Sequence, residues 1–157
     1  MSEALNELSA HIGEIAGGLI TGSEIRYGEL TLTTDAARLI DLITLLRDDV
    51  QCEFVSFIDL CGVDYPRRAN RFDVVYHLLS PRQNLRVRIK LETDEATPVP
   101  SIIEIFPGAG WFEREAWDMY IWPLIIITKD SLRTLPLGIS LFMSSYGTSW
   151  DQLLAIA

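Results

Sequence analysis

Three carboxylates with spacing suited to chemistry lie together at Glu113, Glu115 and Asp118. On a helix, Glu115 and Asp118 are three residues apart and share a face, whereas Glu113 points elsewhere. Paired carboxylates can carry out acid–base catalysis or bind a hard metal ion. A structural role explains them as well, because acidic residues favour a helix N-terminus and Arg114 lies four residues before Asp118, the spacing of a helical ion pair. We favour the structural role and expect no catalytic centre in this chain.

The histidines and cysteines offer little further chemistry. A metal site built on His11 and His77 would need unrelated elements to converge, so we expect His77 to be a cross-strand partner instead. Cys52 and Cys61 do not form a Cys-x-x-Cys pair, and iron–sulfur clusters usually need four thiolates. We expect both to be reduced thiols in the core, carried by strands. The sequence therefore predicts no metal, cluster or other cofactor in this chain.

The charge balance argues against two classes of partner. The chain has 13 basic and 22 acidic residues, a net charge of −9, whereas nucleic-acid binding needs clustered Lys and Arg. The same negative charge disfavours anionic lipid headgroups. No stretch reaches the ~18 apolar residues of a membrane span, and residues 1–20 lack the basic start of a signal peptide. We expect any link to a membrane to pass through other proteins.

Helical and strand patterns alternate through the first fifty residues. Apolar residues at steps of three and four predict a helix over residues 3–16, and a β-branched segment predicts one strand at 24–33. Thr34 is placed to cap a second helix. That helix should bury five apolar side chains: Leu39, Ile40, Leu42, Ile43 and Leu46.

Three strands are expected next, at 53–61, 71–79 and 85–91. The last two should form a hairpin, because Pro81 lies in the short connection between them and residues 85–91 alternate apolar and basic. The basic side chains form a ladder on the outer face, where Asp73 can pair with Lys90 or Arg88 for at most about 1 kcal/mol if exposed. The ladder is a solvated strand face, or it meets an acidic patch on a partner.

Two helical pieces follow. Ser101 and Glu104 have the spacing of a capping box, so a short helix is expected to start at Ser101, and a second piece is expected at 111–120. Phe112 should lie in the core, whereas Trp117 and Tyr120 are candidate anchors of an interface, because large rings in desolvated pockets carry much of a contact's energy. The pattern as a whole predicts a single α+β domain: a mixed or antiparallel sheet with helices packed on one face, followed by a C-terminal segment of doubtful structure.

Several segments resemble the C-subunit family of proton-pumping NADH:quinone oxidoreductase, respiratory complex I. The strongest is Pro107-Gly-Ala-Gly-Trp-Phe-Glu-Arg-Glu-Ala-Trp-Asp-Met-Tyr120, and the order and spacing of the other segments match as well. These are Asp59-Leu-Cys-Gly-Val-Asp64, Arg71-Phe-Asp-Val-Val-Tyr-His-Leu-Leu79, Asn84-Leu-Arg-Val-Arg-Ile-Lys90 and Pro98-Val-Pro-Ser101.

The resemblance implies a non-catalytic assembly role in the peripheral arm. Family members contact the large subunit that helps to form the quinone site and the subunits that carry iron–sulfur clusters. FMN and the clusters belong to those partners, and the arm stands on the cytoplasmic side of the bacterial inner membrane. The residues expected to contact partners are Glu113, Arg114, Glu115, Trp117, Asp118 and Tyr120.

The resemblance stops abruptly after Tyr120. The family continues with a His-Pro-x-Leu-Arg-Arg-like segment, whereas this chain reads Ile121-Trp-Pro-Leu-Ile-Ile-Ile-Thr-Lys-Asp130. A frame shift produces a sharp boundary, whereas gradual divergence blurs one. We therefore divide the chain into a family-like domain at 1–120 and a divergent tail at 121–157, which is out of frame or a genuine variant.

Two other functions stay open on the sequence. One is a free-standing carboxylate-dependent hydrolase, which would turn over substrate as an isolated chain and lose activity on the substitution Glu115→Gln. The other is the equivalent subunit of a membrane-bound hydrogenase complex, which shares the fold and differs in its partners.

Overall fold

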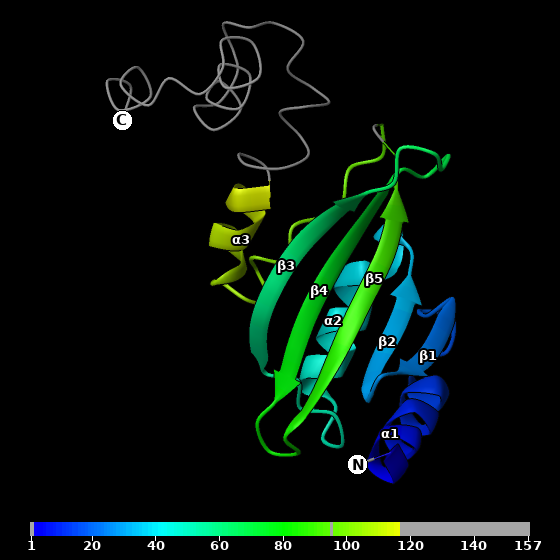
Figure 1. The fold of residues 1–157 in the computed structure, drawn as a ribbon. Coiled ribbons are helices and arrows are strands. Elements are labelled where there is room, and N and C mark those ends of the chain that lie inside the picture. Colours follow the sequence, from blue (N-terminus) through cyan, green and yellow to red (C-terminus); the bar gives the residue numbers. More distant parts are fainter. Residues whose placement is uncertain (1, 95, 117–157) are drawn as a thin grey trace, which may run out of the picture. The chain divides into compact units, whose positions relative to one another are not determined.

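The computed structural model describes residues 2–94 and 96–116 of the chain. Met1–Glu113 form one compact unit, in which a five-stranded sheet has the order β1-β2-β5-β4-β3 (Figure 1). Neighbouring strands are antiparallel except for β2 and β5, which are parallel. The predicted α+β class is confirmed. The elements are α1 (Ser2–Ile15), β1 (Gly22–Arg26), β2 (Glu29–Thr34), the 3-10 turn η1 (Ala36–Arg38), α2 (Leu39–Asp48), β3 (Ser56–Asp64), β4 (Phe72–Ser80), β5 (Leu85–Thr93) and α3 (Ala109–Glu115).

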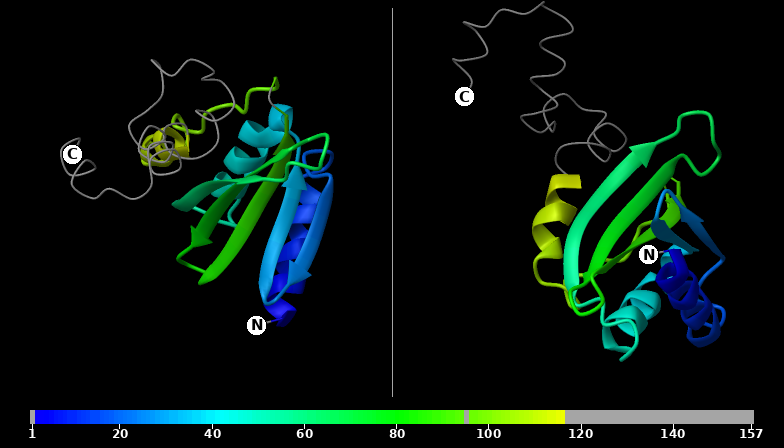
Figure 2. Two further views of the ribbon diagram at one scale, coloured as in Figure 1. Left: turned by 45° about the horizontal axis from the view of Figure 1, so that its top comes forward. Right: turned by 60° about the horizontal axis from the view of Figure 1, so that its bottom comes forward.

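Helices α1 and α2 lie on one face of the sheet (Figures 1 and 2). Their apolar side chains recur at steps of three and four, so each helix presents one stripe to the core. The sheet meets them with the apolar sides of its strands, where side chains alternate between faces. The buried side chains include Leu5, Leu8 and Ile12 of α1, Leu39, Leu42, Ile43 and Leu46 of α2, and Leu30, Leu32, Leu78, Val87, Ile89 and Leu91 of the sheet.

The segment expected to be one strand at 24–33 is a hairpin, so that prediction is wrong. Strand β1 ends at Arg26, which pairs with Glu29, and the two residues between them turn the chain back. Tyr27 and Gly28 both have positive φ, at 54° and 79°, as a type I′ turn requires. Glycine adopts this conformation readily but tyrosine rarely does, so the dipeptide does not carry the usual signature of the turn.

Thr34 does not cap the second helix, which corrects a further prediction. It is the last residue of β2, is buried, and its Oγ1 donates a hydrogen bond to the Leu19 carbonyl at 2.6 Å. The helical region starts with the turn η1 and continues as α2, and no side chain caps either start. The hydroxyl therefore ties β2 to the chain that follows α1, because a buried hydroxyl needs a partner.

The predicted hairpin at 71–91 is confirmed. Strands β4 and β5 pair antiparallel, with Ser80 opposite Leu85 and Val75 opposite Lys90. Strand β3 begins at Ser56, three residues later than expected. The reason is that the chain leaving α2 stays bonded to it, since the Phe54 amide donates to the Leu46 carbonyl at 3.0 Å.

The two cysteines differ from their expected positions. Cys52 is buried, but it lies in the turn between α2 and β3 rather than on a strand. Cys61 does lie on β3, yet it is exposed instead of being part of the core. Both are free thiols. Among the described residues, no helix has the length and apolar character needed to cross a membrane.

Candidate partner-binding surface

Glu113 fastens α3 to the turn that precedes it. Its Oε2 accepts a hydrogen bond from Ser101 Oγ at 2.7 Å, and its Oε1 accepts one from the Ile102 amide at 2.8 Å. The capping box predicted between Ser101 and Glu104 is therefore wrong. The carboxylate that bonds to Ser101 belongs to Glu113, twelve residues further along the chain. Instead of a helix from residue 101, one turn forms, closed by the Phe106 amide on the Ile102 carbonyl at 2.9 Å.

The other predicted contact residues divide into two groups. Arg114 and Glu115 are exposed on the last turn of α3, in a position to meet a partner. Trp117, Asp118 and Tyr120 lie outside the described residues, so their grouping with Glu115 stays a prediction. The carboxylate of Glu113, which was expected to point away from Glu115 and Asp118, bonds to Ser101 Oγ and the Ile102 amide.

Aromatic packing joins β3 to the segment at 106–112. The ring of Phe57 meets Phe112 edge to face, with centroids 5.2 Å apart, and stacks on Phe106 at 6.0 Å. Such aromatic pairs contribute about 0.5–1.5 kcal/mol beyond their buried area. Phe112 was expected in the core, but it is only half-buried, and its ring contact with Phe57 packs α3 beside the strand.

Exposed apolar side chains surround this aromatic cluster. We name the set Val55, Ile58, Ile103 and Trp111 the edge surface; their side chains are 55%, 41%, 44% and 77% exposed. Ile103 lies over Gly110, where an added Cβ would come within 2.7 Å of Ile103 Cδ1. A side chain at position 110 would therefore displace Ile103. Sequence analysis did not single out any of the four as a contact residue, because their exposure depends on the tertiary fold.

Strand β3 adds backbone groups to the same surface. In the described sheet it is an outer strand that pairs only with β4, and its register is irregular between Phe57 and Asp59. Outer strands present unpaired N–H and C=O groups, which proteins usually protect with lysine, proline or a covering segment. The nine residues of β3 contain neither lysine nor proline. An outer strand and exposed apolar side chains on or next to it are both features that other proteins bind.

The basic ladder on β5, formed by Arg86, Arg88 and Lys90, has a different character, because Arg88 and Lys90 are paired within the chain. Lys90 Nζ lies 2.7 Å from Asp73 Oδ2, and Arg68 Nη1 donates to both oxygens of Asp73, at 3.2 and 3.3 Å. The predicted Asp73–Lys90 pair is confirmed. Asp73 is only 1% exposed, however, so this is a buried carboxylate rather than the exposed pair considered from sequence.

His77 continues this network and is poorly suited to catalysis. Its Nε2 accepts a hydrogen bond from Arg88 Nε at 3.1 Å, and Arg88 also pairs with Glu29. Burial, and then the charge of Arg88, lower the pKa of His77, so the imidazole is neutral at pH 7 with its proton on Nδ1. That Nδ1 is buried and has no hydrogen-bond partner among the described residues. The predicted role of His77 as a cross-strand partner is confirmed. We name Arg68, Asp73, His77, Arg88, Lys90 and Glu29 the polar face.

Comparison with known proteins gives a consistent set of matches. A family model described as "Respiratory-chain NADH dehydrogenase, 30 Kd subunit" matches residues 32–121. The C-subunit of the NADH-quinone oxidoreductase of Sinorhizobium medicae is 71% identical over 120 residues, which cover 76% of this chain and 60% of the relative. The first of the C-subunits of the same oxidoreductase in Rhizobium meliloti is 68% identical with the same coverage. The chain thus spans 60% of the length of these relatives.

One solved structure has a similar fold. It is a chain of the membrane-bound sulfane sulfur reductase, an archaeal respiratory membrane complex, with a TM-score of 0.63 and 21% sequence identity. The match covers 73% of this chain and 66% of that chain. At this identity the similarity concerns the arrangement of helices and strands alone.

Proposed function

The chain belongs to the family of the 30 Kd subunit of respiratory-chain NADH dehydrogenase, and we propose that it is a non-catalytic assembly subunit in the peripheral arm of proton-pumping NADH:quinone oxidoreductase. The observation that carries this proposal is the match over residues 32–121, a range that includes all four side chains of the edge surface. An assembly subunit needs a surface that is incompletely satisfied in the isolated chain, and β3 with the edge surface has that property.

The proposed partners are the large subunit of the quinone site and the iron–sulfur subunits. FMN and the clusters would be carried by those partners, since the two free thiols of this chain lie on different elements and one of them is buried. The complex would stand at the bacterial inner membrane on its cytoplasmic side, and this chain would be held there through its partners.

Co-purification tests the proposal. A tagged chain, expressed in a bacterium that makes the other arm subunits, should bring them down, and Arg114→Glu should weaken the recovery because it reverses an exposed charge at the end of α3. Arg67→Glu is the matched control, since Arg67 is exposed in the loop between β3 and β4. Recovery that is equal for both variants would remove Arg114 from the interface. A wild-type chain that recovers no arm subunit would contradict the proposed function itself.

The tail at 121–157 is best explained by a shift of reading frame, which we propose as its origin. The family model ends at residue 121, and the alignments with the rhizobial relatives cover 120 of the 157 residues. Sequencing the coding DNA across codon 121 and translating every frame tests this directly. A family-like continuation in a shifted frame supports the proposal, whereas its absence from all frames means that the tail belongs to the protein.

A further inference from the structure

A cluster of three potential ligands links α1 to the end of α2. His11 Nε2 donates to Asp49 Oδ1 at 2.9 Å, because a carboxylate can only accept. Cys52 lies beside them, and one ligand atom from each of the three residues falls within 4.8 Å of the other two. The cluster is shielded from solvent: Cys52 is fully buried, while His11 and Asp49 are 19% and 21% exposed.

The central carboxylate is held in place by the backbone. The amides of Gln51 and Cys52 donate to Asp49 Oδ1 at 2.9 and 3.0 Å, in the turn where α2 ends. Groups that orient a ligand through hydrogen bonds are a regular part of metal sites and raise their affinity. Asp49 is therefore oriented by its own turn before any ion binds.

The chemistry of the three side chains selects a class of ion. An imidazole, a carboxylate and a thiolate are the ligands that zinc uses, with bonds of about 2.0–2.3 Å to nitrogen, oxygen and sulfur. Ca²⁺ and Mg²⁺ prefer oxygen ligands only, and a thiol among three ligands disfavours them. Ligand atoms around a tetrahedral zinc at these bond lengths lie about 3.3–3.8 Å apart. Binding therefore requires the 2.9 Å contact between His11 and Asp49 to widen and any wider spacing, up to 4.8 Å, to close.

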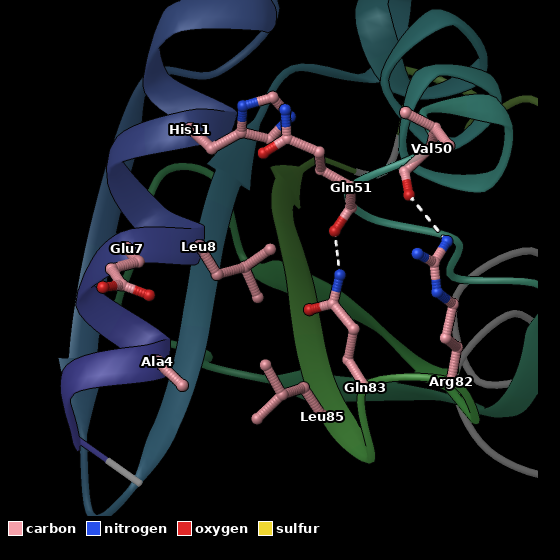
Figure 3. Close-up of a pocket in the computed structure, with 9 residues that line it drawn as sticks. All are labelled: Ala4, Glu7, Leu8, His11, Val50, Gln51, Arg82, Gln83 and Leu85. Carbon is pink, nitrogen blue, oxygen red and sulfur yellow. Dashed lines mark hydrogen bonds between the residues drawn. The ribbon is translucent and has the colours of Figure 1, made fainter.

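A pocket provides access to the cluster. It has a volume of about 370 Å³ and is lined by residues of α1, the turn after α2 and the hairpin between β4 and β5. His11 and Gln51 lie at one end of it, as Figure 3 shows. Of the three candidate ligands, His11 lines this space, whereas Asp49 and Cys52 do not, so an ion or a water molecule would reach the cluster past His11. The other lining residues are Ala4, Glu7, Leu8, Val50, Arg82, Gln83 and Leu85.

We propose that His11, Asp49 and Cys52 bind Zn²⁺ or a similar divalent transition metal, with a water molecule from the pocket as the fourth ligand. The ion takes the place of the hydrogen bond between His11 and Asp49, and the imidazole proton moves to Nδ1. Cys52 releases its thiol proton to solvent and binds as the thiolate. Bound metal fastens α1 to the turn after α2 and stabilises the folded chain by mass action.

The thiol gives the site a spectroscopic signature. A free thiol is protonated at neutral pH, whereas zinc binds the thiolate. A thiolate at this position therefore forms only when a metal displaces the proton. Co²⁺ reports such a bond through a sulfur-to-metal charge-transfer band in the near ultraviolet.

The test titrates the full chain, stripped with a chelator, with Co²⁺ and then with Zn²⁺. We expect the charge-transfer band to saturate at one Co²⁺ per chain, to disappear when Zn²⁺ displaces it, and to be absent from Cys52→Ser. The chain supplies its own matched controls, because Cys61 and His77 lie on other elements. Cys61→Ser and His77→Gln should keep the band, whereas His11→Gln should weaken Co²⁺ binding at least about tenfold.

Two results would overturn the site. One is a wild-type chain without a band at saturating Co²⁺. The other is a band that survives in Cys52→Ser or that depends on Cys61. Far-ultraviolet circular dichroism of each variant checks folding, and His11→Gln decides the question if Cys52→Ser unfolds, because the side chain of His11 is part exposed at the pocket.

Discussion

The polar face and the edge surface differ in how their side chains are satisfied. On the polar face, Asp73 has two cationic partners and Arg88 has three hydrogen-bond partners, His77, Thr31 and Glu29, all within the chain. On the edge surface, Ile58 and Trp111 are left 41% and 77% exposed beside an outer strand. Paired charges give little reason for a partner to bind, whereas exposed apolar groups gain from burial. From sequence, the basic ladder was either a solvated strand face or a contact with an acidic patch of a partner, and the comparison favours the apolar surface as the interface.

The largest effect is expected from breaking the polar face. Lys90→Met leaves the buried carboxylate of Asp73 with Arg68 alone, and losing one partner of a buried pair should lower the free energy of unfolding by about 3 kcal/mol. Urea denaturation measures the loss. Arg86→Met is the control on the same strand, since Arg86 is exposed and should change stability by less than about 0.5 kcal/mol. Equal stability of the two variants would mean that Asp73 does not depend on Lys90.

A smaller change in stability is expected from two glycine-to-alanine substitutions, which distinguish the packing of Ile103 at the edge surface from helix propensity. Gly13→Ala on α1 meets nothing within 4 Å and should stabilise the chain by about 1 kcal/mol. Gly110→Ala has the same gain in propensity, but its Cβ would lie 2.7 Å from Ile103 Cδ1, so the clash should cancel most of the gain. Thermal unfolding compares the two. Equal stabilisation would show that Ile103 is not held against Gly110.

The smallest effect concerns pH. The pKa of His77 is lowered in the folded chain, so below its ordinary value of about 6.5 the unfolded chain binds the proton more readily. Stability should therefore fall as the pH drops from about 6.5 toward the lowered pKa, and no contribution from His77 should be visible above this window. Denaturation at pH 7.5 and 5.5 should show a larger loss for the wild type than for His77→Gln. Parallel losses would mean that His77 titrates alike in both states.

Local sequence patterns predicted the hairpin of β4 and β5, but they did not predict the pairing of strands that are distant in the sequence. The hairpin of β4 and β5 follows from alternating residues and a short connection, both of which are visible in sequence. The hairpin of β1 and β2 was missed because its turn uses a tyrosine at φ 54° instead of Asn or Asp before the glycine. The parallel pairing of β2 with β5 joins residues more than fifty positions apart and has no local signal.

The candidate partner-binding surface was predicted only in part, because its contacts also join residues that are distant in the sequence. The capping box predicted at Ser101 was wrong, because no helix starts there and Ser101 bonds to Glu113, which the tertiary fold brings back to the turn. Ile58 and Ile103 could not be identified, because apolar residues in a strand or turn are usually buried and only the fold shows their exposure.

The most direct test of the edge surface replaces its most exposed side chain. Trp111→Ser should reduce recovery of the arm subunits with the tagged chain about tenfold or more, because truncating an aromatic anchor costs about 2 kcal/mol of binding. Tyr27→Ser is the control, since Tyr27 is 97% exposed at the tip of the β1–β2 hairpin, away from this surface. Loss with Trp111→Ser and normal recovery with Tyr27→Ser is the predicted result. Normal recovery with Trp111→Ser, or equal loss with both variants, would contradict the edge surface as the place where partners bind.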